Sequence, residues 1–118
     1  MALDAAAARK RLMAEREGLL RSLAEESLPE LDQLTYGSQA ASASQVFEQS
    51  RALALRANLE NTLRQVEEAL DRCEAGTYGA CQACGGEIPD ERLEFLPYAA
   101  RCVRCQERYE RTLTPPPT

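Results

Sequence analysis

The sequence predicts a mainly α-helical protein with a long antiparallel helical hairpin, or coiled coil, a small cysteine-rich globular part and a C-terminal helix. More than half of its 118 residues are Ala, Glu, Lys, Leu or Arg, a composition typical of long helices and coiled coils. Apolar residues recur every three or four positions through most of residues 1–75. All five cysteines follow this region or close it, from Cys73 onward.

The first helix is expected from residue 3 to about residue 34, where Ala, Leu, Arg and Glu dominate. Pro29 interrupts this segment and Ser27 can cap a restarted turn, so the sequence predicts a kink there. The expected apolar stripe consists of Met13, Leu20, Ala24, Leu31 and Leu34, widened by Leu12, Leu19 and Leu23.

A second helix is expected from about Ser42 to Ala75, after a small, uncharged connecting turn. Ser42 or Ser44 can cap its start, with Gln45 completing a capping box from Ser42. Gly76 stands where a C-cap glycine belongs, and the helix would be about 50 Å long. Its expected apolar face consists of Ala52, Leu55, Leu59, Leu63, Val66, Leu70 and Cys73.

Two helices of matched length with facing apolar stripes form an antiparallel hairpin, because neither is stable without the other. We expect the coiled-coil hairpin to occupy residues 1–75, with its tip near residues 35–44. A cysteine-rich part with a C-terminal helix would follow over residues 76–113, and residues 114–118 would form a disordered tail. We interpret the apolar stripes as core, and the tip as a plain connector or a contact surface.

Four of the cysteines form two C-x-x-C pairs, Cys81 with Cys84 and Cys102 with Cys105, separated by residues 85–101. This spacing is typical of a two-knuckle site for one Zn²⁺, which prefers four thiolate ligands in a tetrahedron. Gly85 and Gly86 let the chain curl so that backbone N–H groups approach the thiolates. Four thiolates leave no position for water or substrate, so the sequence predicts a structural zinc finger with four cysteine ligands.

Other uses of the cysteines remain open at this point. The two pairs could form disulfides or a redox-active C-x-x-C site, and a [4Fe–4S] cluster is disfavoured because ferredoxin runs have other spacings. Cys73 falls on the apolar face of the second helix, where it is either a small buried hydrophobe or a spare thiol that reacts when the zinc site is oxidised.

Composition excludes several classes of function. Histidine is absent, which excludes Ser-His-Asp and Cys-His catalysis, H-E-x-x-H proteases and zinc fingers that use histidine ligands. No nucleophile–base pair is evident, so we expect no enzymatic activity. The net charge of −5 disfavours non-specific nucleic-acid binding. Neither a membrane-spanning run nor a secretory signal is evident, so we expect a cytoplasmic location without membrane contact.

One basic face stands out near the C-terminus, where residues 102–113 are expected to be helical. Its arginines follow each other at steps of three and four residues, which places them on one side. The face is either solvated and paired with Glu107 and Glu110, or a contact for an acidic or phosphate-bearing partner. Its members are Arg101, Arg104, Arg108 and Arg111.

Three stretches together resemble the DksA/TraR zinc-finger family. They are TYGACQACGGEI at 77–88, RLEFLP at 92–97 and CVRCQ at 102–106, and the match covers roughly residues 76–108. The preceding helical region is similar in length and order. The resemblance implies a bacterial protein that binds RNA polymerase and not promoter DNA. It also implies a coiled coil that enters the secondary channel of the polymerase and alters initiation, within the stringent response.

The expected tip departs from the pattern of DksA-like members, which carry two aspartates in D-x-x-D-x-A. An ungapped count from the first zinc cysteine places that motif on Ser38, Gln39, Ala40, Ala41, Ser42 and Ala43. Both aspartate positions are therefore uncharged, at Ser38 and Ala41. A tip without carboxylates cannot make the same charge-assisted contacts near the polymerase metal site.

The resemblance also implies a binding site for the alarmone ppGpp, where DksA-like members offer basic residues. In the same ungapped alignment those positions are uncharged here, at Gln65, Leu96 and Gln106. A tetra- or penta-anion needs Lys or Arg there, so we expect weak ppGpp binding or none. The leading hypothesis is a monomeric, ppGpp-independent RNA polymerase-binding transcription factor. The alternatives are a zinc or thiol redox-stress sensor and a zinc-ribbon nucleic-acid-binding protein.

Overall fold

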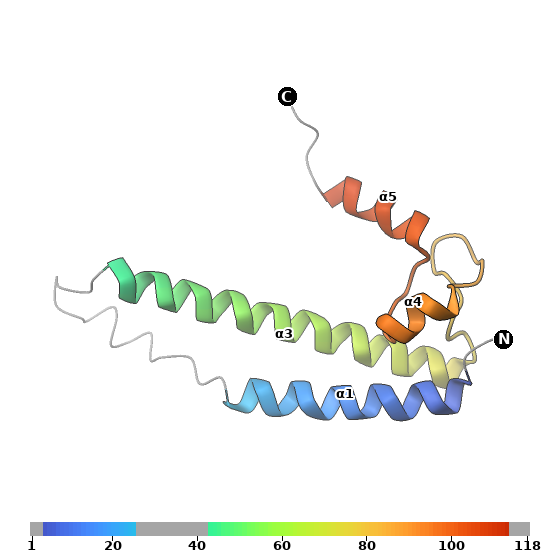
Figure 1. Ribbon diagram of the computed structural model, residues 1–118, viewed down its shortest axis with the longest axis horizontal. Coiled ribbons are helices and arrows are strands. Elements are labelled where there is room, and N and C mark those ends of the chain that lie inside the picture. The colour runs from blue at the N-terminus through green and yellow to red at the C-terminus, as the bar shows by residue number, and fades with distance from the viewer. Residues whose placement is uncertain (1–3, 26–42, 114–118) are drawn as a thin grey trace. The chain divides into compact units, whose positions relative to one another are not determined.

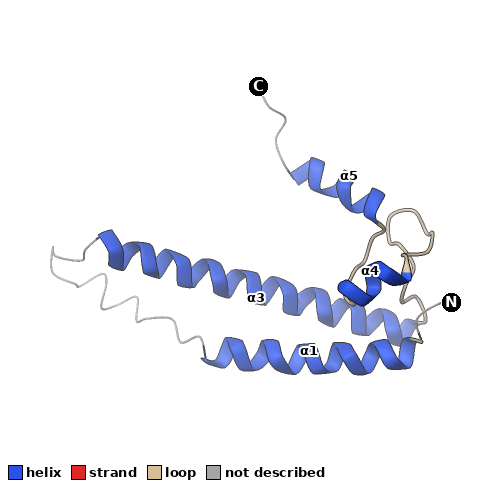
Figure 2. Cartoon of the chain, viewed as in Figure 1, coloured by secondary structure: helices blue, strands red, loops and turns tan. Residues whose placement is uncertain are grey.

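The computed structural model describes residues 4–25 and 43–113, and this part of the chain is mainly helical. Figure 1 shows its helices, α1 (Ala5–Glu25), α3 (Ala43–Ala75), α4 (Asp90–Phe95) and α5 (Val103–Leu113). Figure 2 shows that loops connect α3 to α4 and α4 to α5. An isolated antiparallel bridge joins Ala80 to Glu87 in the first of these loops. The predicted mainly α fold is confirmed. Within the described ranges, no helix is both long enough and apolar enough to cross a membrane.

Helix α1 begins at a capping residue that the sequence analysis did not identify. The backbone N–H of Ala6 donates to Asp4 Oδ1 at 3.1 Å, and the N–H of Ala8 donates to the Asp4 carbonyl at 3.0 Å. Asp4 thereby satisfies a donor that the first turn leaves free. The predicted continuation to residue 34, including Ser27 and Pro29, lies outside the described residues.

Helix α3 spans 33 residues and ends where the sequence predicts. Gly76 has a φ of 76°, and the N–H of Thr77 donates to the Arg72 carbonyl at 2.9 Å. This is the Schellman arrangement, in which a left-handed glycine lets the chain close over the last helical carbonyls. The predicted C-cap at Gly76 is therefore confirmed. The proposed cap at Ser42 lies outside the described residues.

The chain divides into two compact units, one of Met1–Glu15 with Gln65–Thr118 and one of Arg16–Arg64. In the first unit, α1 contributes the buried residues Ala8 and Leu12, and α3 contributes the buried Val66 and Ala69. An exposed ion pair between Arg9 Nη2 and Glu74 Oε1, 3.9 Å apart, also joins the two helices there. The predicted division between residues 75 and 76 stays a prediction.

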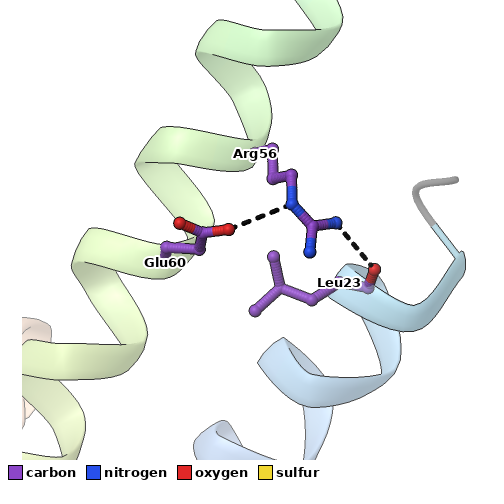
Figure 3. Close-up of polar contacts among 3 residues, drawn as sticks. All are labelled: Leu23, Arg56 and Glu60. Carbon is purple, nitrogen blue, oxygen red and sulfur yellow. Dashed lines mark hydrogen bonds and ion pairs between the residues drawn. The ribbon is translucent and has the colours of Figure 1, made fainter. Parts of the chain in front are cut away.

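In the second unit, an arginine of α3 binds the backbone of α1. Arg56 Nη1 donates to the Leu23 carbonyl at 3.3 Å, and Arg56 Nε lies 3.0 Å from Glu60 Oε1 (Figure 3). Leu23 lies near the C-terminal limit of the described part of α1. Arg56 therefore joins α3 to a backbone carbonyl of α1.

The prediction of the apolar stripe of α1 is wrong for Met13 and Leu20, which are exposed and not packed in the core. Met13 and Leu20 are 42% and 39% exposed, whereas Leu12 is fully buried. Leu19 and Leu23 are half-buried, and Ala24 is exposed. Adjacent apolar residues form two stripes about 100° apart on a helix, and the packed one includes Leu12 and the small Ala8.

The expected apolar face of α3 is confirmed except at Leu55. Leu55 is 44% exposed, and Arg56 is the half-buried residue there, because its guanidinium reaches the Leu23 carbonyl of α1. The long aliphatic stem of arginine lets it occupy a partly apolar position while its charged end finds polar partners. The remaining residues of the expected face are buried or half-buried, namely Ala52, Leu59, Leu63, Val66, Leu70 and Cys73.

Candidate metal centre

Two separate segments of the first unit bring four cysteines together. Cys81 and Cys84 lie in the loop after α3, Cys102 immediately precedes α5, and Cys105 lies in the first turn of α5. Their four Sγ atoms lie within 4.8 Å of one another. All five cysteines of the chain are described, and each is a free thiol. The two predicted knuckles therefore converge on one point.

The first knuckle is shaped by the two glycines that follow it. The N–H of Cys81 donates to the Gly86 carbonyl at 2.7 Å, and the N–H of Gly85 donates to the Cys81 carbonyl at 2.9 Å. Gly85 has a φ of 76°, a left-handed conformation that side chains with a Cβ rarely adopt. The N–H of Gly86 then reaches Cys84 Sγ at 3.4 Å. The predicted curl of the chain toward a thiol is confirmed.

The metal centre and the apolar core of this region share residues. Cys81 and Cys105 are buried in a cluster with Ile88, Leu93 and Ala99. Cys84 is exposed and Cys102 is half-buried. The cluster is small, so a bound metal would supply much of the free energy that folds this region.

Without a metal, burial and hydrogen bonds within the cluster shift the pKa values of two thiols, Cys81 and Cys105. Burial raises the pKa of Cys81, but N–H groups, first that of Cys102, donate to its sulfur, and the net effect is a lowered pKa. Hydrogen bonding to the thiols of Cys102 and Cys81, together with burial, raises the pKa of Cys105. A divalent cation replaces the thiol protons, because cysteine ligands bind a metal as thiolates. The donor set fits one structural zinc ion, held by four thiolates in a closed site.

A short helix that the sequence analysis missed supports the centre from one side. Helix α4 begins after Pro89, whose carbonyl accepts from the N–H groups of Arg92 at 3.0 Å and Leu93 at 3.1 Å. Its first turn carries two acidic residues, Asp90 and Glu91, which favour a helix N-terminus. The run Pro-Asp-Glu was the signal available in the sequence. Helix α4 delivers Leu93 to the core cluster.

Residues 97–101, which we call the strap, lead into the second knuckle. Each of its carbonyls accepts a hydrogen bond from a donor outside the strap. The donors are Tyr78 Oη to Pro97 at 2.9 Å, Arg72 Nη2 to Tyr98 and Ala99 at 3.4 Å each, the Gln82 N–H to Ala100 at 2.9 Å, and Arg92 Nε to Arg101 at 3.0 Å. The strap is thereby tied to α3, the first knuckle and α4.

Arg72 is the residue in this network that sequence reasoning missed entirely. It lies in the last turn of α3, is only 8% exposed, and belongs to the buried face. Its Nε and Nη1 atoms are buried without a hydrogen-bond partner in the described part of the chain. Burial lowers the pKa of Arg72, and the charge of Glu68 opposes this shift.

Cys73 lies beside this arginine and is half-buried. Burial raises the pKa of its thiol, and the charges of Arg72 and Arg9 oppose that shift only in part. A raised pKa leaves less thiolate at neutral pH, and the thiolate is the reactive form. The environment therefore favours the interpretation of Cys73 as a packing residue.

The predicted basic face is divided between a loop and a helix. Arg104, Arg108 and Arg111 are exposed on α5. Arg101 precedes the helix, and its guanidinium carbon lies 3.9 Å from the centroid of the Tyr109 ring in a cation–π contact. Of the six expected tip residues, Ser38 to Ser42 lie outside the described residues, and Ala43 is the first residue of α3.

Comparisons with known proteins agree with this geometry. The family model of the prokaryotic dksA/traR C4-type zinc finger matches residues 76–111. The RNA polymerase-binding transcription factor DksA of Caulobacter vibrioides is 33% identical over 105 residues, which cover 87% of this chain and 73% of that protein. A solved structure of the transcription factor DksA2 from Pseudomonas aeruginosa matches with a TM-score of 0.73 and 31% identity, covering 92% of this chain and 84% of the other.

Other relatives share only a segment. An uncharacterized protein of Aquifex aeolicus is 47% identical over 58 residues, which cover 46% of this chain and 40% of that protein. The Bacillus subtilis protein YteA is 44% identical over 57 residues, which cover 48% of this chain and 24% of YteA. The chain therefore spans less than half of the length of these two relatives, whereas the similarity to the Caulobacter protein extends over most of both chains.

Proposed function

The chain belongs to the DksA/TraR family of C4-type zinc-finger proteins, and from this premise we propose that it binds RNA polymerase and modulates transcription. The observation that carries the proposal is that the similarity covers the paired helices as well as the finger. Family members of this kind are transcription factors and not enzymes, in agreement with four cysteines that leave no open position on a metal. In this proposal the protein acts as a monomer in the bacterial cytoplasm.

The helical hairpin is the proposed probe of the polymerase secondary channel, with residues 38–43 as its contact surface. Support comes from the length of α3, 33 residues, and from the resemblance of the chain to family members that use a coiled coil in this way. Because Ser38 and Ala41 replace two acidic positions, we propose that the tip contacts the enzyme without the usual charge-assisted hydrogen bonds. The regulatory output then differs from that of an acidic tip.

Independence from ppGpp is the second part of the proposal. The positions that would need basic side chains are Gln65, Leu96 and Gln106. In the structure Leu96 packs against the core of the finger, and Gln106 Nε2 lies 3.2 Å from Glu110 Oε1. An apolar side chain and an amide engaged with a carboxylate give a tetra- or penta-anion little to bind.

The base of the protein is proposed to dock through arginines of α5. Arg104, Arg108 and Arg111 are spaced by four and three residues, and all three are exposed. This spacing places them along one side of the helix, where they can meet an acidic surface of the polymerase. Arg101 contributes differently, because its stacking on Tyr109 fixes the orientation of its guanidinium.

Binding is tested with purified core RNA polymerase and tagged protein, with and without zinc. We expect capture of the polymerase by the zinc-loaded protein and a clear loss after chelation. Replacing Arg104, Arg108 and Arg111 together by alanine should weaken capture and reduce its salt dependence. A comparison variant removes three exposed arginines of the proposed probe instead, Arg11, Arg21 and Arg51, and so separates the contribution of α5 from that of the hairpin. No capture by the zinc-loaded protein would refute the proposal.

The tip is tested by transcription in vitro, with and without ppGpp. We expect the wild-type protein to respond equally in both conditions. The double variant Ser38→Asp with Ala41→Asp restores the acidic pattern, and Ser38→Asn with Ala41→Asn matches it in size without charge. A change in output with the aspartates alone supports an electrostatic role of the tip. Equal behaviour of both variants contradicts it, and a ppGpp-dependent wild type contradicts the proposed independence.

A further inference from the structure

Arg72 is poorly explained as a stabilising residue. Its side chain is buried, yet its hydrogen bonds are two contacts of 3.4 Å from the single atom Nη2. Nε and Nη1 remain without a hydrogen-bond partner in the described residues. A buried cation with unsatisfied donors costs free energy, and an apolar residue of similar volume is often as stable or more stable at such a position. Its presence calls for another explanation.

The two carbonyls that Arg72 binds belong to the segment that leads into the metal centre. Its two acceptors are the carbonyls of Tyr98 and Ala99 in the strap, and Cys102 follows three residues after Ala99. Ala99 also belongs to the buried cluster that contains Cys81 and Cys105. A shift of these carbonyls would therefore displace the second knuckle relative to the first.

The other donors to the strap come from the finger and from the loop that enters it. Tyr78 and Gln82 lie on either side of the start of the first knuckle, and Arg92 lies on α4. Arg72 is the donor that comes from α3, a regular helix whose end is fixed by the Gly76 cap. Arg72 therefore fixes the position of the strap relative to α3, which lies outside the finger.

We propose that Arg72 is a positioning residue for the metal centre, which holds the strap on the end of α3 and thereby places Cys102 opposite the first knuckle. Arg72 does not ligate the metal; it acts through the backbone of residues 98–102. Outer partners that orient metal ligands typically change metal retention by about 10- to 100-fold when they are removed. The proposal does not depend on polymerase binding, and its test uses the isolated protein.

The test compares zinc-loaded wild type with Arg72→Met, which keeps an unbranched side chain as far as the position of Nε and removes the donors. Arg64→Met, on an exposed position of the same helix, is the matched control. The first measurement is the rate of zinc transfer to a chromophoric chelator. The second is amide hydrogen exchange at Gln82 and Ala99, which report on the strap, and at Val66 and Ala69, which report on the buried face of α3.

We expect Arg72→Met to release zinc at least about 10-fold faster than the wild type, with Arg64→Met unchanged. Exchange should accelerate at Gln82 and Ala99 and stay at the wild-type rate at Val66 and Ala69. Zinc release at the wild-type rate would overturn the proposal. So would equal acceleration at all four amides, because that pattern indicates general destabilisation of the fold.

A second variant keeps the test decisive if Arg72→Met does not fold. Arg72→Lys retains a cation and N–H donors, but its side chain is one bond shorter than the path to Nη2, so its nitrogen falls short of the two carbonyls. Its zinc release should be faster than that of the wild type, again with local acceleration at Gln82 and Ala99. A wild-type release rate for Arg72→Lys in that case overturns the proposal.

Discussion

Replacing Leu12 by alanine should destabilise the protein far more than the same replacement at Leu20. Leu12 is fully buried, and Leu20 is 39% exposed in the same helix. Removing three buried carbon groups at about 0.8 kcal/mol each loses about 2.4 kcal/mol, and the cavity left behind raises the cost to about 3 kcal/mol. At Leu20 the partly exposed side chain loses about 1.5 kcal/mol at most, because no closed cavity forms.

The difference of about 1.5 kcal/mol corresponds to roughly a tenfold change in the unfolding equilibrium. Urea unfolding followed by circular dichroism at 222 nm, in excess zinc, measures it. Equal slopes of the free energy against urea show that both variants unfold from similarly compact states. If Leu20→Ala costs as much as Leu12→Ala, or more, the packed face of α1 is the Met13–Leu20 stripe after all, and the reasoning fails.

Three further predictions follow from the glycines, the metal and the thiols. Gly76→Ala should cost about 1 kcal/mol because of its φ of 76°, whereas Gly18→Ala inside α1 should stabilise by up to about 1 kcal/mol; thermal melts that move in the same direction contradict this. Zinc removal at neutral pH should abolish the hydrogen-exchange protection of Ile88 and Leu93, whose cluster is small, and retained protection would refute a metal-stabilised finger. Burial raises the pKa of the Cys73 thiol, so the contribution of this thiol to stability is complete below the unfolded thiol pKa of about 8.5 and is lost as the pH rises through the higher folded value. The urea midpoint of Cys73→Ala should therefore fall less above about pH 8.5 than the midpoint of the wild type. Parallel curves of midpoint against pH would contradict this.

The features that the sequence predicts well are those set by local chemistry. Gly76 ends α3 because a left-handed glycine closes a helix whatever surrounds it, and the spacing of Cys81, Cys84, Cys102 and Cys105 is enough to bring four thiols together. The capping aspartate before α1 and the Pro-Asp-Glu start of α4 carry similar local signals, although the periodicity of longer helices drew attention away from them.

The features that the sequence does not predict depend on distant partners. Leu12 and Met13 are adjacent and both apolar, so periodicity alone does not decide which one is packed. Arg56 is half-buried beside the exposed Leu55, because it reaches the backbone carbonyl of Leu23, 33 residues away in the chain. Arg72 resembles any other charged residue of a helix until the carbonyls of Tyr98 and Ala99 are placed against it.

Cys81 and Cys105 serve at once as ligand candidates and as members of the apolar cluster of the finger. This double use constrains how such a sequence can diverge. A descendant that gave up its metal would need new apolar volume at these two buried positions, as well as other ways to hold Ile88, Leu93 and Ala99 together. Cys84 is exposed, so its replacement would leave no void. A single substitution that removes the metal site would therefore disturb the packing least at Cys84.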